Sequence, residues 1–134
     1  MTVTKVFVDT SALYALLDRD DANHGEARVI WARLSNSMLL THNYVLVETT
    51  ALVQRRIGLE VVRTLHDVFK PLLSVVWVDL TTHSLALEAV TASGERAVSL
   101  VDRVSFHVVR TMQCTAVFAF DEDFTRQGID VLKA

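Results

Sequence analysis

Short apolar runs alternate along the chain with longer segments whose apolar residues recur at helical spacing. Four runs suit buried strands because they are short and rich in β-branched, aromatic or leucine side chains: residues 6–8, 38–41, 75–78 and 114–120. Residues 130–132 allow a last edge strand. Strands that alternate with helices favour a mostly parallel sheet with helices on both faces.

The segments between these runs carry the apolar stripes of amphipathic helices. Thr10 or Ser11 can cap the first helix, although Asp9 is also a candidate for that cap. Gly58 and Gly128 are placed to follow helix ends. The predicted helices cover about residues 11–17, 21–34, 43–58, 59–69, 82–93, 99–112 and 121–127, with Asp20 or Asp21 capping the second and Thr81 or Thr82 the fifth.

The composition is that of one folded α/β domain spanning residues 1–134. Hydrophobic residues make up 51% of the chain, which has four Gly and one Pro, so a disordered chain is not expected. No apolar run approaches ~18 residues and the first residues lack a signal-peptide core, so we expect no membrane association. Cys114 is the only cysteine, which excludes an internal disulfide and favours a cytoplasmic location.

Two carboxylates directly follow predicted strands. Asp9 comes after residues 6–8, and Asp121 comes after residues 116–120. In an open α/β sheet, ligands bind at the edge formed by the carboxyl ends of the strands. Both residues also suit a helix cap, because Asp is a common capping residue and negative charge is favourable at a helix N-terminus. The two roles do not exclude each other.

Two further carboxylates lie in predicted helices. Glu48 has no cationic residue three or four positions away, so either a distant Arg or Lys or a metal ion must satisfy it. Asp102 stands at capping-box spacing from Ser99, which is a structural alternative to a metal role. Together with Asp9 and Asp121 they form an oxygen-only set suited to Mg²⁺ or Mn²⁺. A bound cation would also reverse the local effect of the net charge of −3, which by itself argues mildly against nucleic-acid binding.

With these residues the chain resembles the PIN-domain family, and more closely the VapC-type toxins within it. The resemblance runs from residue 5 to about residue 132. It implies a three-layer α/β/α sandwich with strand order 3-2-1-4-5, whose switch point lies between Asp9 and Asp121. The segments that carry it are Val8-Asp9-Thr10-Ser11-Ala12-Leu13, Glu48, Ser99-Leu100-Val101-Asp102, and Phe120-Asp121-Glu122-Asp123-Phe124 with Gly128 following.

The resemblance implies a metal-dependent ribonuclease. Its reaction is the hydrolysis of phosphodiester bonds in single-stranded or loop RNA, assisted by one or two Mg²⁺ or Mn²⁺ ions. Asp123 ranks below the other metal-binding acids because its position varies in the family, and Thr10 or Ser11 is expected to orient a ligand or water. The implied metal-binding and catalytic acids are Asp9, Glu48, Asp102 and Asp121, and the candidate RNA contacts, which equally suit a solvated helix face, are Arg55, Arg56, Arg63 and Arg103.

Partners and alternatives follow from the same residues. The resemblance implies a cognate antitoxin that blocks the site, and a homodimer. Val61, Val62 and Leu65 are candidates for either contact, although core packing is the commoner cause of such a stripe. The alternative to a nuclease is a PIN-fold regulator that binds a partner and has little activity. A haloacid-dehalogenase-like phosphatase is disfavoured, since that class needs a second Asp where Ser11 stands, and the histidines show no paired zinc spacing.

Overall fold

A parallel sheet of four strands forms the middle of the fold in the computed structural model, which describes residues 4–134. The strand order is β3-β2-β1-β4, and each neighbouring pair is parallel. Beside β4 the expected last strand is reduced to one bridge, in which Val131 pairs in parallel with Val117. The predicted order is therefore correct for four strands, whereas the fifth is not a full strand. The strands are β1 (Lys5–Val8), β2 (Met38–His42), β3 (Ser74–Val76) and β4 (Ala116–Phe118).

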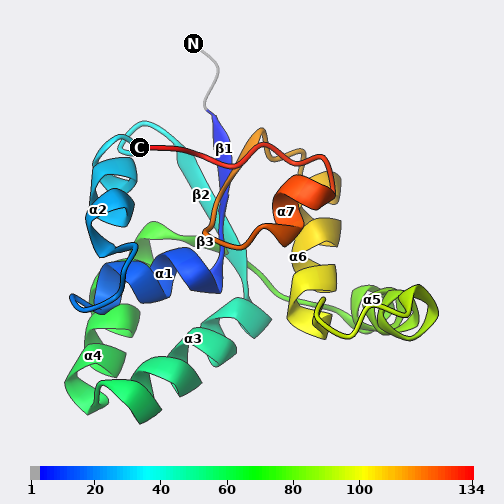
Figure 1. Cartoon of the computed structure of the whole chain (residues 1–134), viewed down its shortest axis with the longest axis horizontal. Helices are drawn as coiled ribbons and strands as arrows, with labels where there is room; N and C mark the ends of the chain where they lie inside the picture. Colours follow the sequence, from blue (N-terminus) through cyan, green and yellow to red (C-terminus); the bar gives the residue numbers. More distant parts are fainter. Residues whose placement is uncertain (1–3) are drawn as a thin grey trace.

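Helices lie on both sides of the sheet. Figure 1 shows α1 to α4 on one side and α6 and α7 on the other, with α5 beside α6. This is the predicted three-layer α/β/α arrangement. No helix within residues 4–134 combines the length and the apolar character that crossing a bilayer requires. The helices are α1 (Thr10–Leu17), α2 (His24–Ala32), α3 (Asn43–Arg56), α4 (Leu59–Thr64), α5 (Leu80–Ser93), α6 (Leu100–Thr111) and α7 (Asp123–Arg126).

The helix predicted over residues 59–69 changes its winding after α4. A π-helical turn covers Leu65–Phe69, and a 3₁₀ turn covers Lys70–Leu72. The N–H of Lys70 donates to the carbonyl of Leu65, five residues back, and Pro71 has no N–H with which to extend an α-helical ladder. Leu65 is fully buried, so it is not available as the partner contact that the sequence allowed. Val61 and Val62 are half-buried against the core.

Aspartates cap two helices where the sequence suggested Ser or Thr. Asp9 is the N-cap of α1, and its Oδ2 accepts a hydrogen bond from the Ser11 N–H at 3.2 Å. Asp79 caps α5, and its Oδ1 accepts from the Thr82 N–H at 2.8 Å. Both aspartates have the extended backbone of a cap residue, so the predictions of Thr10 or Ser11 and of Thr81 or Thr82 were wrong. Also wrong were Asp20 or Asp21 as the cap of α2, which follows Asn23 without a side-chain cap, and a helix start at Asp121, since α7 starts at Asp123.

The register of β1 and β4 brings two strand-end carboxylates to one edge of the sheet. Val8 pairs with Phe118, and the Asp9 N–H continues the ladder by donating to the Phe118 carbonyl at 3.0 Å. The chain that leaves β4 toward Asp121 therefore passes beside Asp9. The fold thus places at its carboxyl edge the two acids that the sequence places after strands.

Candidate functional site

Asp9 is held in a buried position at the junction of β1 and α1. It is only 4% exposed. Its Oδ2 accepts from both the backbone N–H of Ser11, at 3.2 Å, and the hydroxyl of Ser11, at 2.7 Å. Burial is the main cause that raises the pKa of Asp9 to about 7, and the nearby charges of Asp102 and Asp121 raise it further. Asp9 is therefore a carboxylate whose charge the fold itself does not neutralise.

Ser11 joins the two segments that carry the strand-end acids. Its hydroxyl donates to Asp9 and accepts a hydrogen bond from the backbone N–H of Phe120 at 2.9 Å. Phe120 immediately precedes Asp121. A single side chain therefore sets the position of the Asp9 carboxylate relative to the start of the β4–α7 connection.

Three carboxylates on the α6 side of the edge form a tight group. Asp102, Asp121 and Asp123 each offer an oxygen within 4.8 Å of the others. Burial raises the pKa of Asp121, and the charges of Asp102 and Asp123 add to this shift. Asp123, which the sequence ranked lowest, belongs to this group and is 9% exposed. Its Oδ1 lies 3.2 Å from Arg126 Nη1, an ion pair that offsets part of its charge.

The structure confirms one of the two roles that the sequence left open for Asp102, the capping role, and the metal role stays a prediction. Its Oδ2 accepts from the Ser99 N–H at 3.0 Å, and the Ser99 hydroxyl accepts from the Asp102 N–H at 3.1 Å, so the predicted capping box is confirmed. Burial nevertheless raises the pKa of Asp102, and the charges of Asp123 and Glu48 raise it as well. The cap fixes the carboxylate at the start of α6 without supplying a cation.

A pocket of about 330 Å³ joins these groups at the carboxyl edge of the sheet. Glu48 lines it from α3, and it takes part in none of the ion pairs among residues 4–134, so no distant Arg or Lys accounts for it. Asp123 belongs to the tight group but does not line the pocket. The lining residues are Asp9, Thr10, Ser11, Tyr14, Asp21, Asn23, Glu48, Leu52, Arg56, Asp102, Phe120 and Asp121.

Several lining residues escaped the sequence analysis. The helical period offered a signal for two of them, because Leu52 follows Glu48 by four residues and Tyr14 follows Thr10 by four. Neither a leucine nor a tyrosine indicates a functional site by its residue type alone. The others come from the α1–α2 connection and from the end of β4, whose approach to the acids depends on tertiary packing: Asp21, Asn23 and Phe120.

Thr10 and Ser11, both predicted to orient a ligand or water, differ in their hydrogen bonding. Ser11 already donates to Asp9 and accepts from Phe120. Thr10 is 6% exposed, and its hydroxyl oxygen has no hydrogen-bond partner in the structure. A buried hydroxyl without a partner is costly, so this group is suited to a ligand or a water in the pocket.

The structure separates the four candidate arginines. Arg55, Arg56 and Arg63 are all exposed, and of these three only Arg56 lines the acidic pocket. Arg103 follows Asp102 on α6 but turns toward α5, where its Nη2 lies 3.6 Å from Glu95. The predicted set therefore does not form one continuous groove at this pocket.

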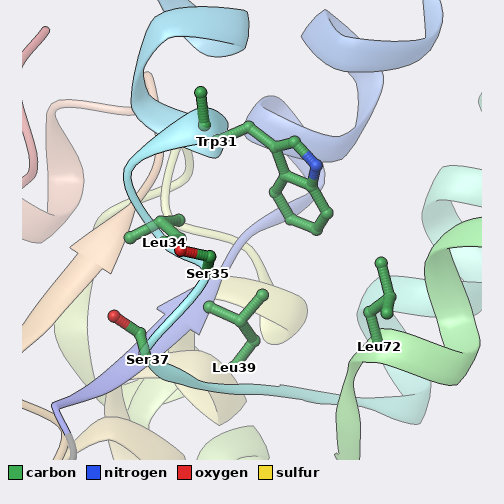
Figure 2. Close-up of a pocket in the computed structure, with 7 residues that line it drawn as sticks. Trp31, Leu34, Ser35, Ser37, Leu39 and Leu72 are labelled. Carbon is green, nitrogen blue, oxygen red and sulfur yellow. The ribbon is translucent and has the colours of Figure 1, made fainter.

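A larger hollow lies at the other end of the sheet. Its volume is about 460 Å³, and it is formed by the end of α2, the start of β2 and the 3₁₀ turn before β3. Figure 2 shows Leu72 on a separate segment, across from Trp31 and Leu39. None of its lining residues carries a titratable side chain. The acidic pocket is therefore the better candidate for chemistry, although it is smaller.

Comparison with known proteins accounts for most of the chain. A family described as the PIN domain matches residues 6–129. The 23S rRNA-specific endonuclease VapC20 of Mycobacterium tuberculosis is 37% identical over 126 residues, which are 92% of this chain and 94% of that protein. These matches confirm the resemblance that the sequence motifs predicted.

Solved structures show the same fold. The crystal structure of Mycobacterium tuberculosis VapC20, described as a sarcin–ricin loop cleaving toxin, has a TM-score of 0.88 at 32% identity and covers 96% of this chain and 99% of that one. FitAcB of Neisseria gonorrhoeae has a TM-score of 0.69 at 12% identity, with 95% and 96% of the two chains covered. VapBC2 of Rickettsia felis has a TM-score of 0.69 at 11% identity, with 96% and 98% covered. The predicted fold class is confirmed.

Proposed function

The chain belongs to the PIN-domain family, and we propose that it is a toxin-type endoribonuclease that uses divalent metal to hydrolyse RNA. One observation carries the proposal. The relative at 37% identity is an rRNA-specific endonuclease, and this chain holds an acidic pocket at the sheet edge where α/β proteins bind ligands. The match extends over 92% of this chain and 94% of that protein.

The residues of the pocket fit a divalent cation. The tight group offers only carboxylate oxygens, and the pKa values of Asp9, Asp102 and Asp121 are raised by burial and by the charges of neighbouring carboxylates. A hard cation such as Mg²⁺ or Mn²⁺ suits this donor set, and its charge would offset the repulsion. When bound, such an ion activates water and stabilises charge on a phosphate. We propose Asp9, Glu48, Asp102 and Asp121 as its principal ligands, with Asp123 supporting them.

The remaining residues position these acids and the substrate. Ser11 keeps the Asp9 carboxylate at a set place beside the β4–α7 connection. The Ser99 cap does the same for Asp102 at the start of α6. Thr10 has a free hydroxyl that can donate to a phosphate oxygen or to a water. No side-chain nucleophile is needed, because water is the attacking group in this class of hydrolysis.

The substrate that best matches the comparisons is a loop of ribosomal RNA. VapC20 is described as specific for 23S rRNA and as cleaving the sarcin–ricin loop. RNA loops expose bases and a bent backbone, which proteins can bind without opening a duplex. We therefore propose the sarcin–ricin loop as the first substrate to test.

The likeness to a toxin also supports proposals on partners. We propose a cognate antitoxin that covers the acidic pocket, a homodimer as the free form, and action in the cytoplasm, where the single Cys114 stays reduced. A protein that cleaves an essential RNA needs such a blocking partner.

A cleavage assay on a short RNA hairpin tests the proposal. Purified protein is incubated with a sarcin–ricin hairpin and with a hairpin of the same stem and a different loop, in Mg²⁺, Mn²⁺ or chelator. We expect cleavage of the first hairpin in metal, its loss in chelator, and its loss in Asp121→Asn, because Asn keeps the shape but not the charge. Cleavage that persists in chelator, or in folded Asp121→Asn, contradicts the proposal. No cleavage of any RNA would favour the partner-binding regulator instead.

A further inference from the structure

We propose that Arg56 holds an RNA phosphate beside the cleaved bond, and that the ring of Tyr14 fixes its guanidinium for this task. The inference rests on the proposed ribonuclease function and names a positioning pair for it. Neither residue belongs to the acids that would hold the metal. The pair lines the same pocket from α1 and α3, and α3 also contributes Glu48 to that lining.

Arg56 is the single Lys or Arg among the residues that line the acidic pocket. Its α3 neighbours in that lining are Leu52, four residues earlier, and Glu48, eight residues earlier, so all three share one face of α3. The lining also carries five carboxylates, so Arg56 is the one charged side chain in it that attracts a phosphodiester. One cation at the wall therefore decides the direction from which an RNA strand can enter.

Tyr14 restrains the guanidinium. The Cζ atom of Arg56 lies 5.4 Å from the centroid of the Tyr14 ring, within the range of a cation–π contact. The Tyr14 hydroxyl donates to Asp18 Oδ2 at 2.7 Å, which holds the ring at the end of α1. An exposed arginine normally samples many rotamers, so a stacked one loses less entropy when it binds a phosphate.

The charge of Arg56 is not taken up by a carboxylate at contact distance. The three ion pairs among residues 4–134 involve Arg103 and Arg126. The Arg56 side chain also interacts with the Tyr14 hydroxyl, but a guanidinium has five N–H donors, so the other edge of its plane remains available. That edge is the part that binds phosphate with two parallel hydrogen bonds.

None of the other candidate arginines lines the acidic pocket, although Arg103 also lies over an aromatic ring, that of Phe106. Arg55, the neighbour of Arg56, is exposed as Arg56 is, but it lies outside the pocket lining. Arg63 is exposed on α4. Arg103 pairs with Glu95, and its side chain is 13% exposed. Arg55 therefore provides a matched control, since its substitution removes the same charge one residue away.

The test compares Arg56→Gln with Arg55→Gln on the sarcin–ricin hairpin at saturating Mn²⁺. We expect Arg56→Gln to lower kcat/KM about tenfold, mostly through KM, and to reduce the slope of log affinity against log salt by about 0.7, the value of one phosphate contact on a single strand. Arg55→Gln should stay within about twofold of wild type. Mn²⁺ affinity should be unchanged in both variants.

Two variants of Tyr14 test the restraint. Tyr14→Phe keeps the ring and should retain most of the activity, whereas Tyr14→Leu should reproduce the KM effect of Arg56→Gln. The double variant Tyr14→Leu/Arg56→Gln should have nearly the same KM as Arg56→Gln alone, because both substitutions remove the same phosphate contact. Thermal melts identify any variant that fails to fold.

Failure of this inference can be told apart from failure of the proposed function. The RNA affinity of the Arg56→Gln and Arg55→Gln variants is also measured in an Asp121→Asn background, where the RNA is bound without being cleaved. If wild type shows no metal-dependent cleavage, the proposed function is wrong. If wild type cleaves but Arg56→Gln and Arg55→Gln have equal effects on KM, affinity and salt slope, Arg56 is not the phosphate contact. If Tyr14→Leu leaves KM unchanged, the ring does not position it.

Discussion

Replacing Asp9 by Asn should make the metal-free protein more stable. Asp9 is buried, and its two hydrogen bonds from Ser11 both end on Oδ2. The carbonyl oxygen of Asn can take the place of Oδ2 and keep both bonds. The amide group then replaces Oδ1, and no negative charge remains to repel Asp102 and Asp121. Most substitutions of buried residues destabilise, so this expectation is specific to a crowded acid site.

The size and sign of the effect follow from the pKa of Asp9. The pKa of Asp9 is about 7 in the folded protein against an ordinary value of 3.8, so the unfolded chain ionises this group more readily. The folded state therefore binds more protons between about pH 4 and pH 7, and stability falls as the pH rises through that window. Above it the loss levels off at no more than about 4 kcal/mol, from ~1.4 kcal/mol for each pKa unit. Asn lacks this loss, so the variant gains most at the alkaline end.

Thermal melts in chelator at about pH 5 and about pH 8 measure this difference. For a domain of this size a gain of a few kcal/mol raises Tm on the order of 10 °C. Mn²⁺ at about 100 times its Kd should raise the free energy of unfolding of wild type by about 2.7 kcal/mol, and that of Asp9→Asn by less. Asp20→Asn, an exposed acid in the turn after α1, is the matched control and should change little. If Asp9→Asn melts no higher than wild type at the alkaline pH, the acids do not repel one another as described.

Three further changes separate structural support of the acids from metal binding. Ser99→Ala should cost roughly 0.5–2 kcal/mol of stability, because it removes a helix cap, while leaving Mn²⁺ affinity nearly intact. Asp102→Asn should weaken Mn²⁺ binding in calorimetric titrations. Equal Mn²⁺ affinities in the two variants would show that Asp102 acts only as a cap. Ser11→Ala removes the bridge between Asp9 and the Phe120 N–H, so we expect kcat to fall about tenfold or more with KM little changed, and an unchanged kcat would show that the bridge does not position the acids.

The sequence predicted the sheet because its strands are short, apolar and separated by helices. Residues 6–8 form the centre of the sheet, and Asp9 follows them as expected. The strand predicted over residues 114–120 is longer than β4, which pairs with β1 only at Ala116, Val117 and Phe118. Strand length depends on the partner that is present, which the apolar pattern does not record.

The candidate site was predictable only in part. Asp9 and Asp121 stood out because they follow strands, and Glu48 because it lacked a local cation; together with Asp102 they do line one pocket. Asp123 joins the tight group through the turn at the end of β4, where its N–H bonds to the Asp121 side chain. The Ser11 bridge spans more than a hundred residues of sequence, and the stacking of Arg56 on Tyr14 depends on how α1 packs on α3. Such contacts have no signature in a single sequence.

Mapping of RNA ends on intact ribosomes tests the central claim most directly. Ribosomes are incubated with wild type in Mn²⁺, with wild type in chelator, and with Asp121→Asn in Mn²⁺, and new 5′ ends are sequenced across all RNAs. The proposed function predicts one dominant new end in the sarcin–ricin loop of 23S rRNA, present in the first sample and absent from the other two. An end that appears equally in chelator or with Asp121→Asn would contradict a metal-dependent cleavage by this pocket, and ends scattered over many RNAs would contradict the proposed substrate.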